Sequence, residues 1–435
     1  MSARIVLVIF NIFDLIWSRV KAKIAKIQRD KKLPDEVADI YDAERYQTFL
    51  DYKADNSKMM FIKHIINFVI DTSIILSPIY TWIENLANKN VYLVVIVNYL
   101  FLMIIEKIVS IPFSYYNTFV IQEKYKQNKM TKKTFVKDTI VSIILENVMM
   151  IVLLEIFTCI AFGLKNLSLK IHLGYGKGFL VCLAVAAGIF LIIFLLLLIQ
   201  LVSLRIQYKF TPLEDGELKD KINKLQESSK KKVKKIYVYN ESKKSVSKNA
   251  FLLKLFWYRE FGIADNFINE NSERELLAVL SHEVGHLKHK KDFIDYLGYV
   301  ELVILFVLMW LYVADPGKFP IIEMLNNWVM RSFDITVPNY YVILFVLLSF
   351  GRPLFALFGL FTNYRQRKEE YEADQEAVKN GYGEELIETF KRMSSDELID
   401  INPHPLFVAL YHDHPTIYQR IVAIREGIQR LGYDS

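Results

Sequence analysis

Long runs of apolar residues constrain the fold of this chain more than any other feature of its sequence. A mostly apolar run of about 18 residues is long enough to cross a bilayer as a helix. Seven spans are predicted, at residues 1–17, 61–83, 91–112, 139–162, 178–204, 296–314 and 340–361. Hydrophobic residues form 53% of the chain, above the roughly 45–50% of ordinary globular proteins. The sequence therefore predicts a mainly α-helical, polytopic membrane protein and excludes a plain soluble enzyme.

The basic residues between these spans predict an orientation. Lys and Arg number ten in residues 18–60, one in 84–90, six in 113–138, three in 163–177 and two in 315–339. Because basic loops face the cytosol, the N-terminus is expected outside and the C-terminus inside. The long segments 205–295 and 362–435 then both lie on the cytosolic side. The membrane is expected to be that of the endoplasmic reticulum in a eukaryote or the inner (plasma) membrane in a bacterium.

Charge and cysteine content exclude several kinds of site. The net charge of +6 is expected to orient loops and to meet the anionic lipids of a bilayer, and no nucleic-acid-binding module is recognised. Both cysteines, Cys159 and Cys182, lie in apolar spans, which argues against a disulfide framework and against a Cys-based zinc site. Charged residues inside a span predict either a wet interior or pairing between helices. These residues are Glu106, Lys107, Glu146, Glu155, Glu301 and Arg352.

The motif His282-Glu283-Val284-Gly285-His286 carries the chemistry of segment 205–295. A capping-box pattern at Ser272–Glu275 predicts a helix that continues through the motif. Residues four apart share one helix face, so both imidazoles can bind one ion while Glu283 turns toward a water on it. This HExxH spacing is typical of zinc peptidases. The alternative is a surface helix with two exposed histidines.

A catalytic zinc site needs a third protein ligand. After the last predicted span, residues 365–377 have a helical pattern that Gly381 is expected to close. The spacing leaves four carboxylates open as the ligand: Glu369, Glu370, Glu372 and Asp374. Glu370 and Asp374 are four apart, so one could ligate the metal while the other orients a ligand histidine.

Two further segments are candidates for contact with a substrate. Asn249-Ala250-Phe251 leads into a predicted strand, which could bind an extended peptide as an edge strand, with Asn249 as a side-chain clamp. An ordinary strand is the alternative. Nearer the C-terminus, His414 or Arg420 could stabilise the oxyanion of a tetrahedral intermediate, and His414 is the favoured donor.

These motifs, in this order, resemble the type 1 CAAX prenyl protease family of membrane-embedded zinc endopeptidases. The segments that carry the resemblance are 112–131, 212–218, Asn249–Phe251, the HExxH motif, Glu370–Asp374 and His414–Arg420. The resemblance implies that Glu370 is the third zinc ligand, that Asp374 is its partner behind the ligands, and that Asn249 positions substrate. It also implies seven helices that enclose a chamber, and substrates with a prenylated C-terminal CAAX sequence that lose their last three residues.

The expected enzyme is thus a membrane zinc metalloendopeptidase with one Zn²⁺ per chain. Its expected partners are the lipid bilayer and a peptide or protein substrate, with or without a prenyl group. The expected organisation is a membrane region at 1–204 with five spans, a cytosolic-side segment at 205–295 with a small β-sheet, two spans at 296–361 and a C-terminal segment at 362–435. Two alternatives remain open: an HtpX-like quality-control protease, and a receptor or transporter with a metal-free pseudoprotease segment.

Overall fold

The structure is a computed structural model of the 435-residue chain. The residues that it describes are 1–164, 166, 167, 170, 174–227, 229, 232–255, 258–289, 303, 304, 306–311, 314 and 321–432. The predicted sixth span, 296–314, and its charged residue Glu301 lie largely outside these residues.

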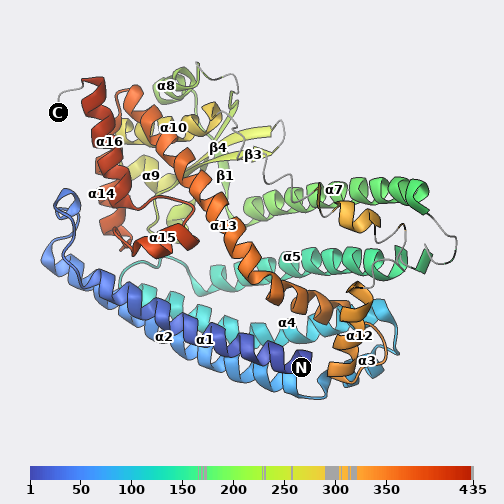
Figure 1. Cartoon of the computed structure of the whole chain (residues 1–435). Coiled ribbons are helices and arrows are strands. Elements are labelled where there is room, and N and C mark those ends of the chain that lie inside the picture. The colour runs from blue at the N-terminus through green and yellow to red at the C-terminus, as the bar shows by residue number, and fades with distance from the viewer. Residues whose placement is uncertain are drawn as a thin grey trace.

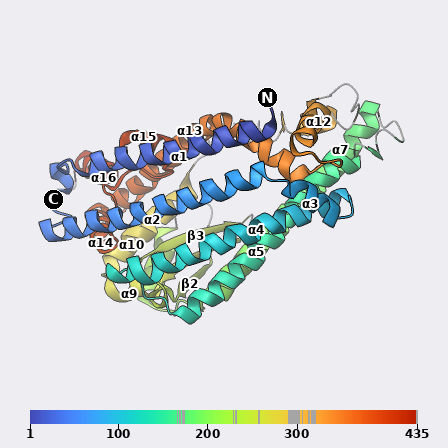
Figure 2. The same cartoon turned by 90° about the horizontal axis from the view of Figure 1, so that it is seen from below.

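Five long helices form the first half of the chain and pack beside one another (Figure 1). They are α1 (Ala3–Arg29), α2 (Ala43–Leu76), α4 (Val91–Tyr116), α5 (Lys132–Thr158) and α7 (Gly174–Gln207). The π-helical turns η2 (Asn117–Gln122) and η3 (Cys159–Leu164) extend α4 and α5. Figure 2 shows α1 and α2 running along the same side of the molecule.

The predicted multi-pass membrane protein is confirmed. Among the described residues, four helices are long and apolar enough to cross a membrane, and the bent helix α13 (Tyr340–Lys379) would make a fifth. The four are Ala43–Leu76, Val91–Gln122, Lys132–Gly163 and Gly174–Gln207. Helix α1 covers the predicted first span but does not belong to this set, so the total of seven spans stays a prediction.

The predicted span 61–83 is wrong as a single helix. Helix α2 ends at Leu76, and α3 (Ile79–Leu86) begins after Pro78. The ring of a proline disfavours helical conformation in the residue before it, and Ser77 is extended, with φ −78° and ψ 165°. Hydropathy continues across this break, which is why the apolar run alone does not reveal it.

Helix α13 changes direction within the predicted span 340–361. It bends by 65° between Arg352 and Ala356, where the sequence has Pro353. Proline lacks a backbone N–H and commonly kinks a helix. Beyond the bend, the helix continues to Lys379, and Gly381 follows with φ +77°. This left-handed conformation suits glycine after a helix end, as predicted.

A small mixed sheet follows the membrane helices, as predicted. Its strands are β1 (Phe210–Pro212), β2 (Lys235–Tyr239), β3 (Ala250–Leu255) and β4 (Tyr258–Ala264), in the order β1-β2-β4-β3. Strands β2 and β4 are parallel, and the other two pairs are antiparallel. Strand β3 therefore lies at an edge of the sheet, with Leu253 opposite Glu260 in the register.

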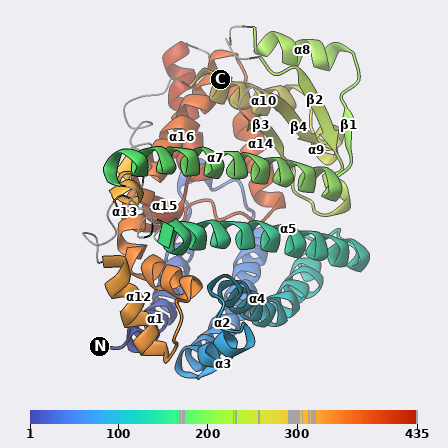
Figure 3. The ribbon, with the colours of Figure 1, turned by 90° about the vertical axis from the view of Figure 1, so that its right-hand side faces the viewer.

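Shorter helices surround the sheet and the end of α13 (Figure 3). They are α8 (Glu217–Leu225), α9 (Asp265–Glu270), α10 (Glu273–Lys288), α14 (Gly383–Asp396), α15 (Pro405–Tyr411) and α16 (Ile417–Leu431), with the 3₁₀ turns η1 (Asp35–Val37) and η4 (Glu241–Lys243). Helix α12 (Ile321–Phe333) lies at the other end of the molecule, beside α1. Helix α10 begins with the predicted capping box between Ser272 and Glu275. Thr416 and Gln419 form another at α16.

Two buried apolar clusters hold the helix that carries the HExxH motif. One includes Phe261 of β4 and Leu280 and Val284 of α10, which packs the helix on the sheet. The other joins Ala278 of α10 to Val378 of α13 and to the helices α14 and α16. Helix α10 is therefore fixed between a sheet and a helical layer. Burial of this kind is the main source of stability for a helix of its length.

The loops that connect the long helices gather at two ends of the molecule. At one end, the backbone N–H of Ala3 donates to Ser332 Oγ at 2.9 Å, and that of Thr336 donates to Glu84 at 2.7 Å. At the other end, Arg29 pairs with Asp400 at 2.7 Å, and Gln127 Nε2 donates to the carbonyl of Asp396 at 2.8 Å. Loop 84–90 and residues 321–339, the described part of 315–339, therefore lie at the first end. Loops 18–60 and 113–138 lie at the second, together with the C-terminal segment.

Candidate metal centre

The centre lies where α10 crosses the second half of α13. At the crossing, a Cβ added to Gly285 would lie 2.6 Å from the Cα of Ala373, a distance that real Cβ atoms do not reach. Only glycine lets the two helices approach this closely. Sequence analysis singled out the two histidines around Gly285 and missed the glycine itself. The position of Gly285 within the HExxH motif does not reveal that α13 crosses α10 at this residue.

His282 and His286 share one face of α10, as their spacing predicts. Their ring centroids lie 4.8 Å apart and the rings are nearly perpendicular, at 86°. The carboxylate of Glu370 reaches both rings, with one oxygen 3.5 Å from His282 Nε2 and the other 3.2 Å from His286 Nε2. Glu283 can place an oxygen within 4.8 Å of nitrogens of both histidines.

Of the four carboxylates that the sequence leaves open, Glu370 is the one that the structure brings against both imidazoles. Glu369 instead lies 3.4 Å from Arg365, and Glu372 lies 2.7 Å from Nδ1 of His289. His289 follows the HExxH motif on α10 by three residues and was not singled out in the sequence. It lies against Glu372, away from the two motif histidines.

The donor set fits a metal ion. Glu370 is buried, and its Oε2 atom accepts no hydrogen bond from any described residue. Arg420 Nη1 lies 3.4 Å from this oxygen as an ion pair without a hydrogen bond, so the oxygen can still ligate a metal ion. Two imidazole nitrogens and one carboxylate also form one of the usual three-ligand sets of a catalytic zinc site. The histidines and Glu370 are therefore the residues that would hold the ion.

Asp374 orients His282 from behind. Its side chain is fully buried, and Oδ1 lies 2.9 Å from His282 Nδ1. Because the carboxylate can only accept, we assign the imidazole proton to Nδ1, which leaves the lone pair of Nε2 for the metal. The spacing of Glu370 and Asp374 on one face of α13 produces this arrangement.

Arg420 closes the site from the first turn of α16. It donates to both oxygens of Asp374, from Nε at 2.9 Å and from Nη2 at 2.7 Å. Its Nη1 lies 3.4 Å from Glu370 Oε2, and its guanidinium covers the ring of Phe390 at 4.2 Å. Burial alone would lower the pKa of Arg420, but the carboxylates around it, Asp374 first and then Glu370 and Glu283, together raise it. The guanidinium is thus held in place by its hydrogen bonds to Asp374.

His414 is the more accessible of the two predicted oxyanion donors. It lies in the loop before α16, and its Nε2 is 3.4 Å from Glu370 Oε1. Asp413 holds its Nδ1 at 2.8 Å. Because the side chain is 58% exposed, its Nε2 can turn toward a bound substrate without breaking a buried network.

Burial and hydrogen bonding act in opposite directions on His286. Burial alone would lower the pKa of this imidazole, but the hydrogen bond to Glu370 and the charges of Glu370 and Glu283 together raise it. A raised histidine pKa favours the proton, which competes with a metal for the same nitrogen. Binding of an ion to this site must therefore release that proton.

The edge strand β3 lies beside the metal helix. Lys254 Nζ, on β3, donates to the carbonyl of His286 at 3.0 Å. Ala250 and Phe251 pair with Ile263 and Gly262 of β4, which leaves the other side of β3 as an edge within the described sheet. Asn249 precedes the strand and is exposed. The structure thus brings the predicted substrate strand and the metal site together.

Polar contacts from Glu397 hold the residues before this strand. Sequence analysis did not predict these contacts. The carboxylate of Glu397, at the end of α14, accepts from the backbone N–H of Lys248 at 3.0 Å and from Ser247 Oγ at 3.2 Å. Lys248 Nζ also pairs with Asp396 and Glu270. Burial raises the pKa of Glu397. The partners are 149 and 150 positions apart in sequence, and no local pattern signals this contact.

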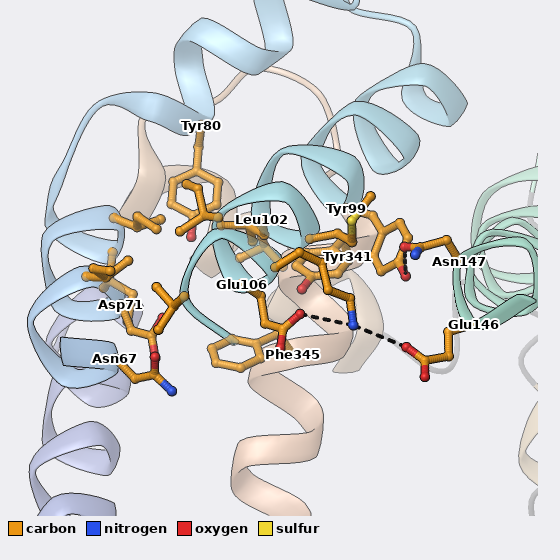
Figure 4. A pocket seen from close by; sticks show the side chains of 18 residues that line it. Asn67, Asp71, Tyr80, Tyr99, Leu102, Glu106, Glu146, Asn147, Tyr341 and Phe345 are labelled. Carbon is orange, nitrogen blue, oxygen red and sulfur yellow. Dashed lines mark hydrogen bonds and ion pairs between the residues drawn. The ribbon is translucent and has the colours of Figure 1, made fainter. Parts of the chain in front are cut away.

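Four of the six charged residues predicted inside spans, Glu106, Lys107, Glu146 and Arg352, form ion pairs. Glu155 Oε1 is buried without a hydrogen bond from any described residue, and Glu301 lies outside the described residues. Lys107 lies 3.3 Å from Glu106 and 3.2 Å from Glu146 of α5, and Figure 4 shows the three side chains at a cavity of about 350 Å³. Asp71 and Asn147 line the same cavity. Arg352 pairs with Asp14 of α1. Two alternatives were predicted for these charges, pairing between helices and a polar interior. The contacts match both, because Lys107 and Glu146 pair across two helices and also line the cavity.

Comparisons with known proteins cover nearly the whole chain. Residues 23–207 match a family model described as the CAAX prenyl protease N-terminal region with five membrane helices, and residues 212–428 match that of peptidase family M48. A probable CAAX prenyl protease 1 of Schizosaccharomyces pombe is 28% identical over 97% of this chain and 88% of its own. A CAAX prenyl protease 1 homolog of Dictyostelium discoideum is 30% identical over 85% of this chain and 82% of its own. The crystal structure of S. mikatae Ste24p has a similar fold, with a TM-score of 0.76 and 21% identity over 98% of this chain and 99% of that one.

Proposed function

The chain belongs to the CAAX prenyl protease 1 family within peptidase family M48, which makes it a membrane metalloprotease, and we propose that its metal is zinc, held by His282, His286 and Glu370. The observation that carries the proposal is the approach of Glu370 to both motif imidazoles, at 3.5 and 3.2 Å. Asp374 supports it because it fixes the tautomer of His282.

The proposed reaction is hydrolysis of a peptide bond. A zinc ion in this site supplies Lewis acidity, which makes the attacking water a stronger acid. Glu283 follows His282 directly on α10, so its carboxylate lies beside the site and takes the proton of that water. The same carboxylate then returns the proton to the leaving amine. His414 donates a hydrogen bond to the carbonyl oxygen as charge develops on it.

Arg420 has a supporting role in this proposal. Its two hydrogen bonds to Asp374 and its burial leave it in place as a clamp behind His282. His414, which is exposed and lies 3.4 Å from Glu370, is better placed to meet a substrate. The notion that His414, not Arg420, stabilises the oxyanion therefore rests on the different burial of the two side chains.

The proposed substrate is a protein or peptide with a prenylated C-terminal CAAX sequence that loses its last three residues. Relatives that match over most of the chain are named CAAX prenyl proteases. The edge of β3 offers backbone hydrogen bonds to an extended peptide, with Asn249 as a side-chain contact at its start. Within this proposal, 1–204 anchors the enzyme, 205–295 and 362–435 form the site, and 296–361 completes the membrane part.

We propose that the site faces the cytosol. The basic loops 18–60 and 113–138 lie at the end of the molecule that carries the metal site, and the loops with few basic residues lie at the opposite end. Basic loops stay on the cytosolic side during insertion. In a eukaryotic cell the expected membrane is that of the endoplasmic reticulum, and in a bacterium it is the plasma membrane.

Two carboxylate variants of the purified protein test the function. Glu370→Ala should lose most of the roughly one zinc per chain, because it removes a ligand. Glu283→Ala should keep zinc and lose cleavage of a prenylated CAAX peptide, because the general base is not a ligand. Metal analysis and peptide cleavage measure the two properties separately. Full zinc in Glu370→Ala would refute the ligand set, and continued cleavage by Glu283→Ala would refute the mechanism.

A further inference from the structure

A cavity lies between the end of α7 and strands β3 and β4, on the other side of the sheet from the metal helix. Figure 3 shows the ribbon of α7 beside the sheet. Its volume is about 420 Å³, within the roughly 300–1,000 Å³ of ligand pockets. Most of its lining is hydrocarbon, from residues such as Phe194, Leu198 and Leu201 of α7 and Leu253 of β3. The reaction proposed above does not use it.

The polar side chains at this cavity are already paired with one another. Arg205 Nη2 lies 2.6 Å from each oxygen of Glu260, and Tyr258 donates its hydroxyl to Glu260 Oε2 at 2.5 Å. Glu260 is 1% exposed, and the guanidinium of Arg205 stacks on the ring of Phe210 at 4.0 Å. Because these charges neutralise each other, the cavity suits an apolar ligand better than a polar one.

The cavity borders a helix that faces lipid. Helix α7 is the most hydrophobic of the four candidate spans and is buried over 6% of its apolar window. Val202, which lines the cavity, is 54% exposed. A hydrocarbon chain that lies in the bilayer can therefore reach the cavity along α7 without crossing water.

The register of β3 connects the cavity to the proposed peptide site. Successive side chains of a strand point to opposite faces. Leu253 lies opposite Glu260 and faces the cavity, whereas Lys254, the next residue, reaches the carbonyl of His286 on the metal helix. A peptide added to the edge of β3 alternates in the same way. One of its side chains points toward the cavity while its neighbour points toward the metal helix.

We propose that this cavity binds the isoprenoid chain on the cysteine of the substrate while the peptide pairs with β3. The inference rests on the proposed function and adds to it a place for the lipid. Its basis is the combination of an apolar lining, an internally neutralised charge pair, access from lipid and continuity with the edge strand.

The test compares two CAAX peptides of the same sequence, one S-farnesylated and one unmodified. Leu198→Trp fills the cavity from α7, and Leu195→Trp adds the same bulk to an exposed position of α7 that does not line it. We expect Leu198→Trp to lower the ratio of kcat/KM between the farnesylated and the unmodified peptide by roughly 10- to 100-fold, since several methylenes lose their burial. The ratio for Leu195→Trp should equal that of the wild type.

A binding measurement accompanies the kinetics. In the Glu283→Ala background, a farnesyl-peptide analogue with a photoreactive group at the end of its chain should label residues 194–206. Labelling elsewhere, or an unchanged ratio in Leu198→Trp, would overturn the assignment. Equal cleavage of both peptides by the wild type would also overturn it and leave the protease function standing. If the zinc-loaded wild type cleaves neither peptide, the proposed function fails and the assignment fails with it.

Discussion

Asp374 is a fully buried carboxylate that holds both a ligand histidine, His282, and the guanidinium of Arg420. It accepts from His282 Nδ1 at 2.9 Å and from two nitrogens of Arg420 at 2.9 and 2.7 Å. A buried charge of this kind is tolerated only when it is paired and hydrogen-bonded. The charged partner of Asp374 is Arg420 on α16. Helix α16 therefore helps to orient His282, the ligand histidine on α10.

Asp374→Asn tests this orientation with little change in volume. The amide presents a donor where the carboxylate has an acceptor, so either His282 or Arg420 loses its partner. We expect zinc affinity or activity to fall by about 10- to 100-fold, as for other residues that orient a ligand histidine. Zinc competition with a chelator measures the affinity. Gln375→Asn, on the same helix turn, is the control, and wild-type affinity in Asp374→Asn would contradict the assigned role.

Glu397 gives a prediction for pH. Burial raises the pKa of its carboxyl above the ordinary 4.5, so the folded state favours the neutral form. The stability that this group contributes is present below pH 4.5 and is lost as pH rises through the raised pKa. Glu397→Gln stays neutral and can still accept from the Lys248 backbone. The difference in Tm between Glu397→Gln and wild type should therefore grow in favour of the variant as pH rises through this window.

The exposed Glu384 on α14 provides a control for this titration. Glu384→Gln should leave the pH dependence of Tm close to that of the wild type. A constant difference between Glu397→Gln and wild type from pH 4 to pH 8 would show that the carboxyl titrates alike in the folded and unfolded chains. The raised pKa would then be refuted.

At the scale of elements, the packing of α10 on α13 depends on Gly285. Its added Cβ would lie 2.6 Å from the Cα of Ala373, which is backbone and cannot rotate away. Gly285→Ala should force the helices apart and lower stability by about 1–3 kcal/mol, the usual cost of overpacking. Because Glu370 lies one turn from Ala373, zinc content should fall as well. Thermal unfolding and metal analysis measure the two effects.

Gly188→Ala is the matched control, since a Cβ at that position of α7 meets no atom within 4 Å. It should not lower Tm, because alanine is the better helix former where space is free. An unchanged Tm and full zinc in Gly285→Ala would mean that the helices can separate at no cost. The close crossing would then not be what fixes the site.

Sequence patterns predicted the local parts of these elements well. The capping box at Ser272, the shared face of His282 and His286, and the strand after Asn249 are all set by residues a few positions apart. The choice of Glu370 over Glu369 and Glu372 depends on how α13 is rotated against α10, which no local pattern contains. The break at Pro78 was missed for the opposite reason, because apolar residues continue across it and mask the change of direction.

At the scale of the whole molecule, the metal site lies at one end of the bundle. Helices α14 and α16 and the loop after α14 contact segments 18–60 and 113–138. Examples are Lys391 with Asp39, Arg425 with the carbonyl of Glu36, and Asp400 with Arg29. The N-terminus, α3 and α12 meet at the opposite end. The counts of basic residues in the sequence group these loops in the same way, and the side of the membrane that each end faces stays a prediction.

Cysteine labelling tests the orientation of the two ends. In a background with Cys159→Ser and Cys182→Ser, single cysteines replace exposed residues at one end, Lys31, Lys129 and Glu384, and at the other, Asn85 and Arg331. We expect a membrane-impermeant maleimide to label the first three from the cytosolic side and the last two from the opposite side. Labelling is compared in sealed vesicles of both orientations. Zinc-dependent cleavage by each variant shows that it is folded.

The possible results separate the orientation from the fold. Labelling of all five positions with the sides exchanged would keep the architecture and place the active site outside the cytosol, against the positive-inside prediction. Labelling of Lys129 and Glu384 from opposite sides would contradict the architecture itself. Gln127 and Asp396 are hydrogen-bonded at 2.8 Å in the structure, and a bilayer cannot lie between two loops in contact. Glu384 begins the helix that ends at Asp396, so a single site on one side of the membrane requires these two cysteines to be labelled together.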